Sequence, residues 1–344
     1  MPLKETNLTG PLARALALVA GLVLGVGLLV LLLRTVSGDV LASAFAHVDY
    51  TYLLIALVPF LLTFGIKVTR WELLFGQDSP TWWTLFGAIS VGYGVNTVLP
   101  LRLGEVVTAY WVRDRSRVGM ARALGTIAVE RITDGVAVLL ILVVFAPTVA
   151  FPRALVAPTI VVGGLMVAGL AALVVVALMS APEAGWAQRI IARFRETPLR
   201  VVVEMLGQAL TGVRALRDPG ALSLYLAYTV IIWVSNSVLF WLLVRAFHLD
   251  VPLSAGFLLT GVLFLGMAVP SSPGYLGVFD YLMVLTLSLY DVRHGPAVAA
   301  ALAAHFINFV PVTVVGLLLL ARHGETLVLS LASRSSRPEE RPYS

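Results

Sequence analysis

Long apolar runs are the feature of this sequence that most constrains its fold. A helix needs about 20 apolar residues to cross the hydrocarbon core of a bilayer. With 59% hydrophobic and 12% charged residues, a water-soluble domain could not bury so much apolar surface. The sequence therefore predicts an all-α polytopic membrane protein with about six full spans. These are Leu12–Leu33, Tyr50–Ile66, Met120–Ala146, Leu155–Met179, Ala221–Phe247 and Ala297–Leu320.

The first run could instead be a secretory signal, with Ala42-Ser43-Ala44 as its cleavage site. The apolar core of a signal peptide is usually about 7 to 15 residues long. Leu12–Leu33 exceeds that length, which favours a retained membrane anchor.

Two further apolar stretches, Trp82–Trp111 and Leu253–Tyr290, are interrupted by proline and glycine. In lipid a broken helix persists only where protein or a water-filled cavity satisfies its backbone. A pair of such breaks in two halves of a chain is typical of a transport site. The breaks contain Pro100 and Gly104 in the first stretch, and Pro270, Pro273 and Gly274 in the second.

The basic residues predict the orientation in the membrane. Of the 24 lysines and arginines, 18 can be placed on the cytoplasmic side, four outside, and two (Arg102 and Arg131) in the membrane region. This asymmetry follows the positive-inside rule. Both termini are then expected in the cytoplasm of a cell-membrane protein. Lys67 and Arg70 are counted as cytoplasmic residues in this assignment.

The same assignment puts both ends of Trp82–Trp111 on the cytoplasmic side, so this stretch is expected to enter the membrane and return as a re-entrant hairpin. Leu253–Tyr290 is then a second hairpin from the opposite face, and the two halves form an inverted repeat. Alternatively, each hairpin is two short full spans, which gives eight or more spans.

These assignments predict a single transmembrane domain at residues 1–332 and a disordered tail at 333–344. Within the domain, repeat one covers about 50–146 and repeat two about 221–320. A linking span at 155–179 and an interfacial linker at 182–218 join them.

Charged residues at membrane depth are costly and normally face a cavity or one another. Glu130 and Asp134 share a helix face, and Arg131 can pair with Asp134 three residues away. His305 and Asn308 follow the second break at about the distance at which Glu130 and Asp134 follow the first. The candidate substrate-binding residues are Arg102, Glu105, Glu130, Arg131, Asp134, Ser271, Ser272, Tyr275, Asp280, His305 and Asn308.

The carboxylates in this set exceed the arginines by two, which predicts a charge of −2 if all are ionised. Some carboxylates are then protonated or neutralise a cationic part of the substrate. Alternatively, Arg131 with Asp134, or Arg102 with Glu130, are structural ion pairs, since a buried pair is weak evidence for function. His305 is expected to be packed and hydrogen-bonded, and Asn236 to bond between helices.

Three motifs in order resemble a known family. They are the run Asn96–Glu105, the stretch Glu130-Arg131-x-x-Asp134-Gly135, and Pro270–Gly277 followed by Phe279 and Asp280. The chain resembles, over roughly Leu12 to Arg322, the flippase-like integral membrane family related to the transmembrane region of lysylphosphatidylglycerol synthase. In the best-known relatives this region moves an aminoacylated phospholipid between leaflets and precedes a synthase domain. The resemblance implies lipid translocation by a stand-alone member without that domain.

The leading hypothesis is therefore a translocase for a phospholipid, an aminoacyl-lipid or a lipid-linked glycan. The alternatives are a proton-coupled transporter of a small solute, an intramembrane lipid-modifying enzyme, and a non-transporting scaffold. The chain has no cysteine, no metal-binding histidine spacing and no ATP-binding loop, so no metal, cofactor or catalytic role is expected. Expected partners are membrane lipids, a separate lipid-modifying enzyme and a second copy of the chain, but not nucleic acid.

Overall fold

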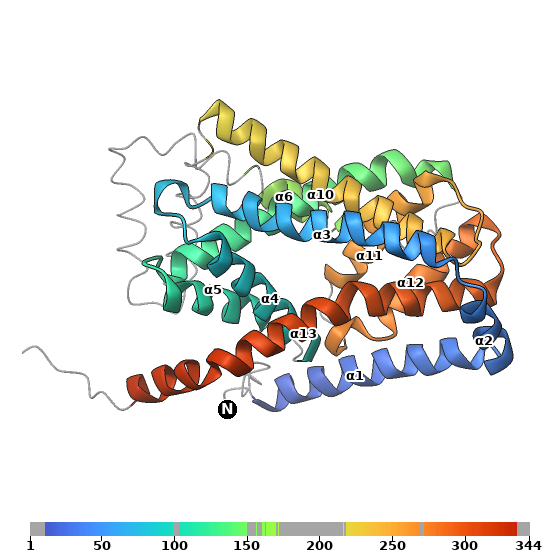
Figure 1. Ribbon diagram of the computed structural model, residues 1–344, viewed down its shortest axis with the longest axis horizontal. Coiled ribbons are helices and arrows are strands. Elements are labelled where there is room, and N and C mark those ends of the chain that lie inside the picture. The colour runs from blue at the N-terminus through green and yellow to red at the C-terminus, as the bar shows by residue number, and fades with distance from the viewer. Residues whose placement is uncertain are drawn as a thin grey trace, which may run out of the picture.

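The computed structural model describes residues 11–98, 103–149, 218–268 and 272–335, with residue 216 and a few residues between 156 and 171. The regular elements in these ranges are helices (Figure 1), which confirms the all-α prediction. The α-helices are α1 (Pro11–Arg34), α2 (Gly38–Ala46), α3 (Tyr50–Leu73), α4 (Trp82–Val98), α5 (Gly104–Arg115), α6 (Met120–Phe145), α10 (Pro219–Arg245), α11 (Leu253–Ala268), α12 (Val278–Leu287) and α13 (His294–Ser335). Short 3-10 helices are η1 (Gly76–Asp78), η2 (Ala146–Thr148), η3 (Pro273–Tyr275) and η4 (Ser288–Tyr290).

Helices α3, α10 and α13 are long and apolar enough to cross a membrane, and α1 with α2, bent by 85°, would add a fourth span within the described residues. Helix α3 exposes Leu54, Val58 and Leu61. This spacing of three or four residues marks a single helix face. Such a stripe suits contact with lipid, and it supports an integral membrane protein.

Both interrupted stretches form two short helices where the sequence predicts a break. Helices α4 and α5 have 17 and 12 residues, and α11 and α12 have 16 and 10. At about 1.5 Å per residue, the longest of these spans about 26 Å, less than the roughly 30 Å of a hydrocarbon core. Short length fits the predicted hairpins, although the number of spans stays a prediction.

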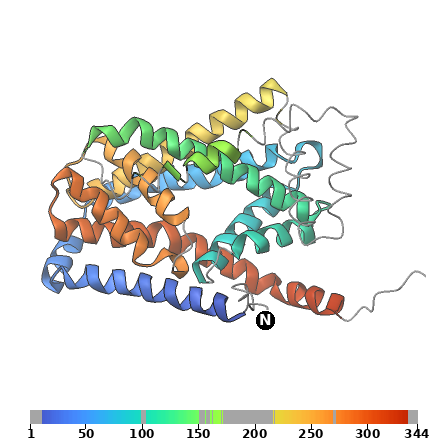
Figure 2. The ribbon, with the colours of Figure 1, turned by 180° about the vertical axis from the view of Figure 1, so that it is seen from behind.

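The two helix pairs lie near opposite ends of α3 (Figures 1 and 2). Hairpins that enter from opposite faces would be arranged in this way. The inverted repeat itself stays a prediction, because the linking span at 155–179 and the linker at 182–218 lie largely outside the described residues. Helix α13 continues to Ser335, and residues 336–344 of the predicted tail also lie outside.

Glycines let the broken segments pack closely. A Cβ at Gly104 would lie 2.0 Å from the carbonyl oxygen of Gly92, so α5 begins in contact with α4. The Asn96 side chain accepts a hydrogen bond from the Gly104 N–H at 2.8 Å, which satisfies a backbone group at the break. A Cβ at Gly274 would lie 3.1 Å from Cγ2 of Thr97. The end of α4 and the turn η3 therefore meet.

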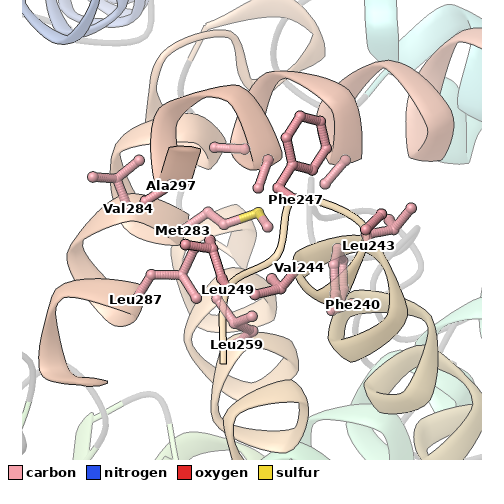
Figure 3. Packing of buried hydrophobic residues seen from close by; sticks show 14 of the residues in the cluster. Phe240, Leu243, Val244, Phe247, Leu249, Leu259, Met283, Val284, Leu287 and Ala297 are labelled. Atoms are coloured by element: carbon pink, nitrogen blue, oxygen red, sulfur yellow. The ribbon is translucent and has the colours of Figure 1, made fainter. Parts of the chain in front are cut away.

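Each half of the chain has its own large hydrophobic cluster. The first-half cluster lies mainly among α3, α4, α5 and α6 and includes Trp71, Leu85 and Val129. The second-half cluster lies largely among α10, α11, α12 and α13, and Figure 3 shows part of it. Met283 of α12 sits there among side chains of its neighbours, including Phe240, Leu243, Val244, Phe247, Leu249, Leu259, Val284, Leu287 and Ala297.

Candidate functional site

The most buried charge in the described part of the chain is Arg70, in the last turn of α3. Its side chain is 0% exposed. Nη1 donates to Oδ1 of Asp134 at 2.7 Å, and Nη2 donates to Oε1 of Glu130 at 3.0 Å. A planar guanidinium suits two carboxylates that lie one helical turn apart on α6. The count of basic residues treated Arg70 only as a topology residue, whereas its side chain turns inward and pairs with α6; its side of the membrane stays a prediction.

Further contacts fix this charge cluster in place. Arg70 Nη1 also lies 3.2 Å from the Thr229 hydroxyl of α10. The guanidinium lies 5.4 Å from the ring centre of Tyr225, and the Tyr225 hydroxyl is 2.9 Å from that of Thr133 on α6. Arg70 therefore joins α3, α6 and α10 through buried polar contacts, as a structural ion pair would.

A second ion pair joins the first hairpin to α6. Nε of Arg131 donates to Oε1 of Glu105 at 3.0 Å, whereas the nearest Arg131–Asp134 distance is 3.9 Å. Glu105, from α5, is thus the closer partner of Arg131, rather than the predicted Asp134. Both side chains are about 30% exposed, and both line a cavity. The Arg70 side chain, in contrast, is fully buried.

Lys67 lies one turn before Arg70 and also points inward. Its ammonium donates a hydrogen bond to the hydroxyl of Tyr93 on α4, and it lies 5.1 Å from the ring centre of that residue. Among the described residues it forms no ion pair with a carboxylate. Adding Lys67 and Arg70 to the buried set offsets the charge of −2 predicted from the sequence. Both cations were left out of that sum because the sequence assignment counted them on the cytoplasmic side.

A cavity of about 210 Å³ is lined by residues of both halves. Its polar and charged lining includes Lys67, Tyr93, Asn96, Glu105, Arg131 and Asp134. Its apolar and aromatic lining includes Phe60, Phe64, Trp233, Phe240, Phe264, Met267 and Phe309. Tyr275 and Asn308 from the second half complete the wall. The cavity is therefore amphipathic and is built from both predicted repeats.

Asn236 and Glu130 both lie near the large cavity, but only Asn236 lines it. Asn236 lines the wall, and its amide donates to the carbonyl of Ile232 in its own helix at 3.0 Å. This hydrogen bond lies within α10, whereas the sequence predicted a bond between helices. Glu130 lines a smaller adjoining cavity of about 30 Å³, which it shares with Lys67 and Arg131. That space is large enough for ordered water.

Asp280 and His305 form a separate buried pair behind Tyr275. Nδ1 of His305 lies 3.0 Å from Oδ2 of Asp280, and Nε2 lies 3.0 Å from the carbonyl oxygen of Gly274. Asp280 also accepts the Gly277 N–H at the start of α12. The expectation of a packed, hydrogen-bonded His305 agrees with this geometry. Neither residue lines the large cavity.

The other predicted site residues have varied positions. The Ser272 hydroxyl donates to the carbonyl of Leu276 at 2.7 Å, so it closes a turn and does not line the cavity. Arg102, Ser271, Pro100 and Pro270 lie outside the described residues. Within the described ranges, no group of three or more His, Asp and Glu side chains could hold a metal ion.

Lys67, Arg70 and Tyr93 are site residues that sequence reasoning missed. The excess of acidic residues was the signal that could have found the two cations, since buried carboxylates are normally paired. Lys67 and Arg70 are three residues apart, which places both on one face of α3.

Comparison with known proteins shows the family of this chain. The family described as the lysylphosphatidylglycerol synthase TM region matches residues 18–316. A "UPF0104 membrane protein" from Methanothermobacter thermautotrophicus is 25% identical over 328 residues, which cover 89% of this chain and 95% of the relative. No solved structure matches. Since the family match covers most of the chain, the protein belongs to the family of the lysylphosphatidylglycerol synthase transmembrane region.

Proposed function

We propose that this protein is a lipid translocase that moves a phospholipid, an aminoacyl-lipid or a lipid-linked glycan between leaflets. The observation that carries this proposal is the amphipathic cavity between the two halves. Its volume of about 210 Å³ suits a headgroup rather than a whole lipid. The headgroup would enter the cavity while the acyl chains stay in the bilayer, against the apolar side chains of the wall.

The charges favour a phosphate as the bound group. Glu130 and Asp134 are engaged by Arg70, whereas Lys67 faces the cavity without a carboxylate partner among the described residues. Arg131 lies beside the same space and is paired with Glu105 on one side. An ammonium and a guanidinium both form charge-assisted hydrogen bonds to phosphate oxygens. Lys67 and Arg131 would therefore bind the phosphate, and Arg102, outside the described residues, stays a further predicted phosphate ligand.

The two hairpins would supply the alternating access. In this proposal the α4–α5 pair is re-entrant from the cytoplasm and the α11–α12 pair from the outside, in a cell-membrane protein with both termini in the cytoplasm. The two hairpins contact each other at Thr97 and Gly274, close to their breaks. Movement of one hairpin would therefore displace the other. No covalent step is assigned to the protein, and a separate enzyme would make the lipid.

The test is transport of a fluorescent phosphatidylglycerol in vesicles of phosphatidylethanolamine and phosphatidylglycerol that contain the purified protein. Dithionite quenches only the outer leaflet, so protein-dependent movement appears as additional quenching. Lys67→Met should abolish this movement, and Lys67→Arg should restore part of it because the charge returns with a different shape. Arg245→Gln is the matched control, since Arg245 pairs with exposed Asp250 away from the cavity.

Normal transport by Lys67→Met at equal abundance would refute the role of Lys67. Absence of lipid movement with the unaltered protein, for phospholipid and glycolipid probes alike, would refute the proposed function itself.

A further inference from the structure

We infer that His305 and Asp280 together bind one proton, and that this proton holds the cavity-facing turn η3 in place. The inference goes beyond lipid binding, because it assigns a proton site to residues outside the cavity wall. Only its consequence for lipid movement rests on the proposed function.

The hydrogen bonds of His305 require the additional proton. Nδ1 faces the carboxylate of Asp280 at 3.0 and 3.1 Å, and Nε2 faces the carbonyl oxygen of Gly274 at 3.0 Å. An ionised carboxylate and a carbonyl can only accept hydrogen bonds, whereas a neutral imidazole carries a single N–H. Both bonds form only if His305 is doubly protonated or if Asp280 carries a proton. In either case the pair holds one proton more than a neutral histidine beside an ionised aspartate.

Because the pair is largely buried, loss of this proton would leave an uncompensated negative charge inside the protein. Asp280 is 1% exposed and the side chain of His305 is 12% exposed. With the proton bound, the pair has no net charge. Without it, the pair carries a buried negative charge and one ring nitrogen faces an oxygen lone pair. One of the two contacts must then break.

The turn held by these bonds has a conformation that needs support. Tyr275 has φ +58°, in the left-handed region that non-glycine residues rarely adopt. The preceding Gly274, whose carbonyl accepts from His305, has φ +61°. The Tyr275 ring lines the cavity and lies 5.9 Å from that of Phe309, which in turn lies 4.8 Å from His305. Release of the Gly274 carbonyl would therefore free a residue of the cavity wall.

The surroundings of His305 offer few other ionisable groups among the described residues. Helix α12 contributes Asp280 and the ring of Phe279, and η3 contributes Tyr275. Helix α4 contributes Thr97 beside Gly274, and α13 itself contributes Asn308 and Phe309 one turn on. The contacts thus assign the proton to Asp280 and His305, with the Tyr275 phenol as the other titratable neighbour.

Asp280→Asn gives a sharp test, because it removes the need for the proton. The introduced amide can donate to Nδ1 of a neutral His305, whose Nε2–H then donates to Gly274. Its carbonyl oxygen can still accept from Gly277. The turn should therefore stay closed in this variant at every pH at which the protein is folded.

The readout is maleimide labelling of a cysteine placed by Thr97→Cys, in purified protein without lipid substrate. The chain contains no cysteine, and Thr97 lines the cavity against Gly274. Labelling should rise by about tenfold per pH unit while the protonated form still dominates, and should level off once the proton is lost, since labelling follows the deprotonated fraction. The comparison must be corrected for the ionisation of the cysteine itself, measured in the Asp280→Asn background.

The expected pattern is distinct for each variant. Labelling should stay low and follow only the cysteine in Asp280→Asn, and it should be high at every pH in His305→Gln. His294→Gln, at an exposed position near the start of the same helix, should behave as the unaltered protein. The inference is overturned if Asp280→Asn keeps the pH dependence of the parent, or if the parent shows none beyond that of cysteine.

The consequence for transport is tested separately in the vesicles described above. A pH gradient should bias movement of fluorescent phosphatidylglycerol by the unaltered protein and should not bias it in Asp280→Asn. Lipid movement that ignores the gradient, in a protein whose turn opens with pH, would refute the coupling. Absence of lipid movement in a protein with the expected labelling would refute the proposed function and leave the proton site supported.

Discussion

Replacing Arg70 should show that its ion pairs stabilise the fold, in contrast to the Arg131–Glu105 pair that lines the cavity. Arg70→Leu removes a fully buried guanidinium and leaves Glu130 and Asp134, 5% and 2% exposed, without their cation. Removing one partner of a buried pair costs about 3 to 5 kcal/mol, because the remaining charge has no compensation. Two carboxylates depend on Arg70, so the loss should lie at the upper end of this range.

The partly exposed pair of Arg131 and Glu105 provides the matched control. Arg131 and Glu105 have side chains about 30% exposed, so water in the cavity screens this pair more than that of Arg70, and its worth should approach the roughly 0 to 1 kcal/mol of exposed pairs. Arg131→Gln should therefore change the free energy of unfolding by less than about 1 kcal/mol while it impairs lipid movement. The two arginines should thus have opposite effects on stability and on transport per folded molecule.

The assay is reversible unfolding of the purified protein in mixed micelles of a mild detergent and dodecyl sulfate. Arg70→Leu combined with Glu130→Gln and Asp134→Asn should regain most of the lost stability, because no buried charge remains unpaired. The destabilisation by Arg70→Leu alone should also shrink at lower pH, where a carboxylate can take up a proton. A cost for Arg70→Leu no greater than that for Arg131→Gln would refute this reasoning.

Two further predictions address packing and topology. A Cβ at Gly316 would lie 2.1 Å from the carbonyl oxygen of Ser90. Gly316→Ala should therefore force α13 away from α4 and lower the free energy of unfolding by about 1 to 3 kcal/mol. Gly27→Ala, where a Cβ would meet nothing within 4 Å, should be neutral in the same unfolding assay. In whole cells and inverted vesicles, a cysteine at Ser79 should react only from the cytoplasm and one at Asp250 only from outside; reaction of both from one face would contradict the predicted orientation.

The positions of the helix breaks could be predicted from the sequence because their causes are local. Proline removes a backbone donor, and glycine allows close approach or positive φ. Helix α4 ends at Val98 and α5 begins at Gly104, around the predicted first break. Near the second, α11 ends at Ala268 and η3 begins at Pro273. The apolar runs likewise predicted α3, α6, α10 and α13, since hydrophobicity over 20 residues is a property of the chain segment itself.

The pairing of the charges could not be predicted in the same way. Arg70 and Glu130 are 60 positions apart in the chain, and their contact depends on which face of α3 turns toward α6. A count of basic residues contains no side-chain direction. Arg70 and an exposed flanking arginine therefore contribute equally to the positive-inside asymmetry. Asp134 was likewise a reasonable partner for Arg131 by spacing, until the arrangement of α5 brought Glu105 closer.

The corrected pairing changes which headgroup the site should prefer. If Glu130 and Asp134 were free, they would form an acidic wall for a cationic aminoacyl group. Arg70 occupies both, and Glu105 is held by Arg131, so an incoming cation would have to compete with an existing arginine. An anion that binds Lys67 displaces no ion pair among the described residues, because the described hydrogen-bond partner of Lys67 is the Tyr93 hydroxyl. Competition by unlabelled lipids should therefore rank phosphatidylglycerol above its lysyl ester, and the reverse order would indicate that the ion pairs of the site open to admit substrate.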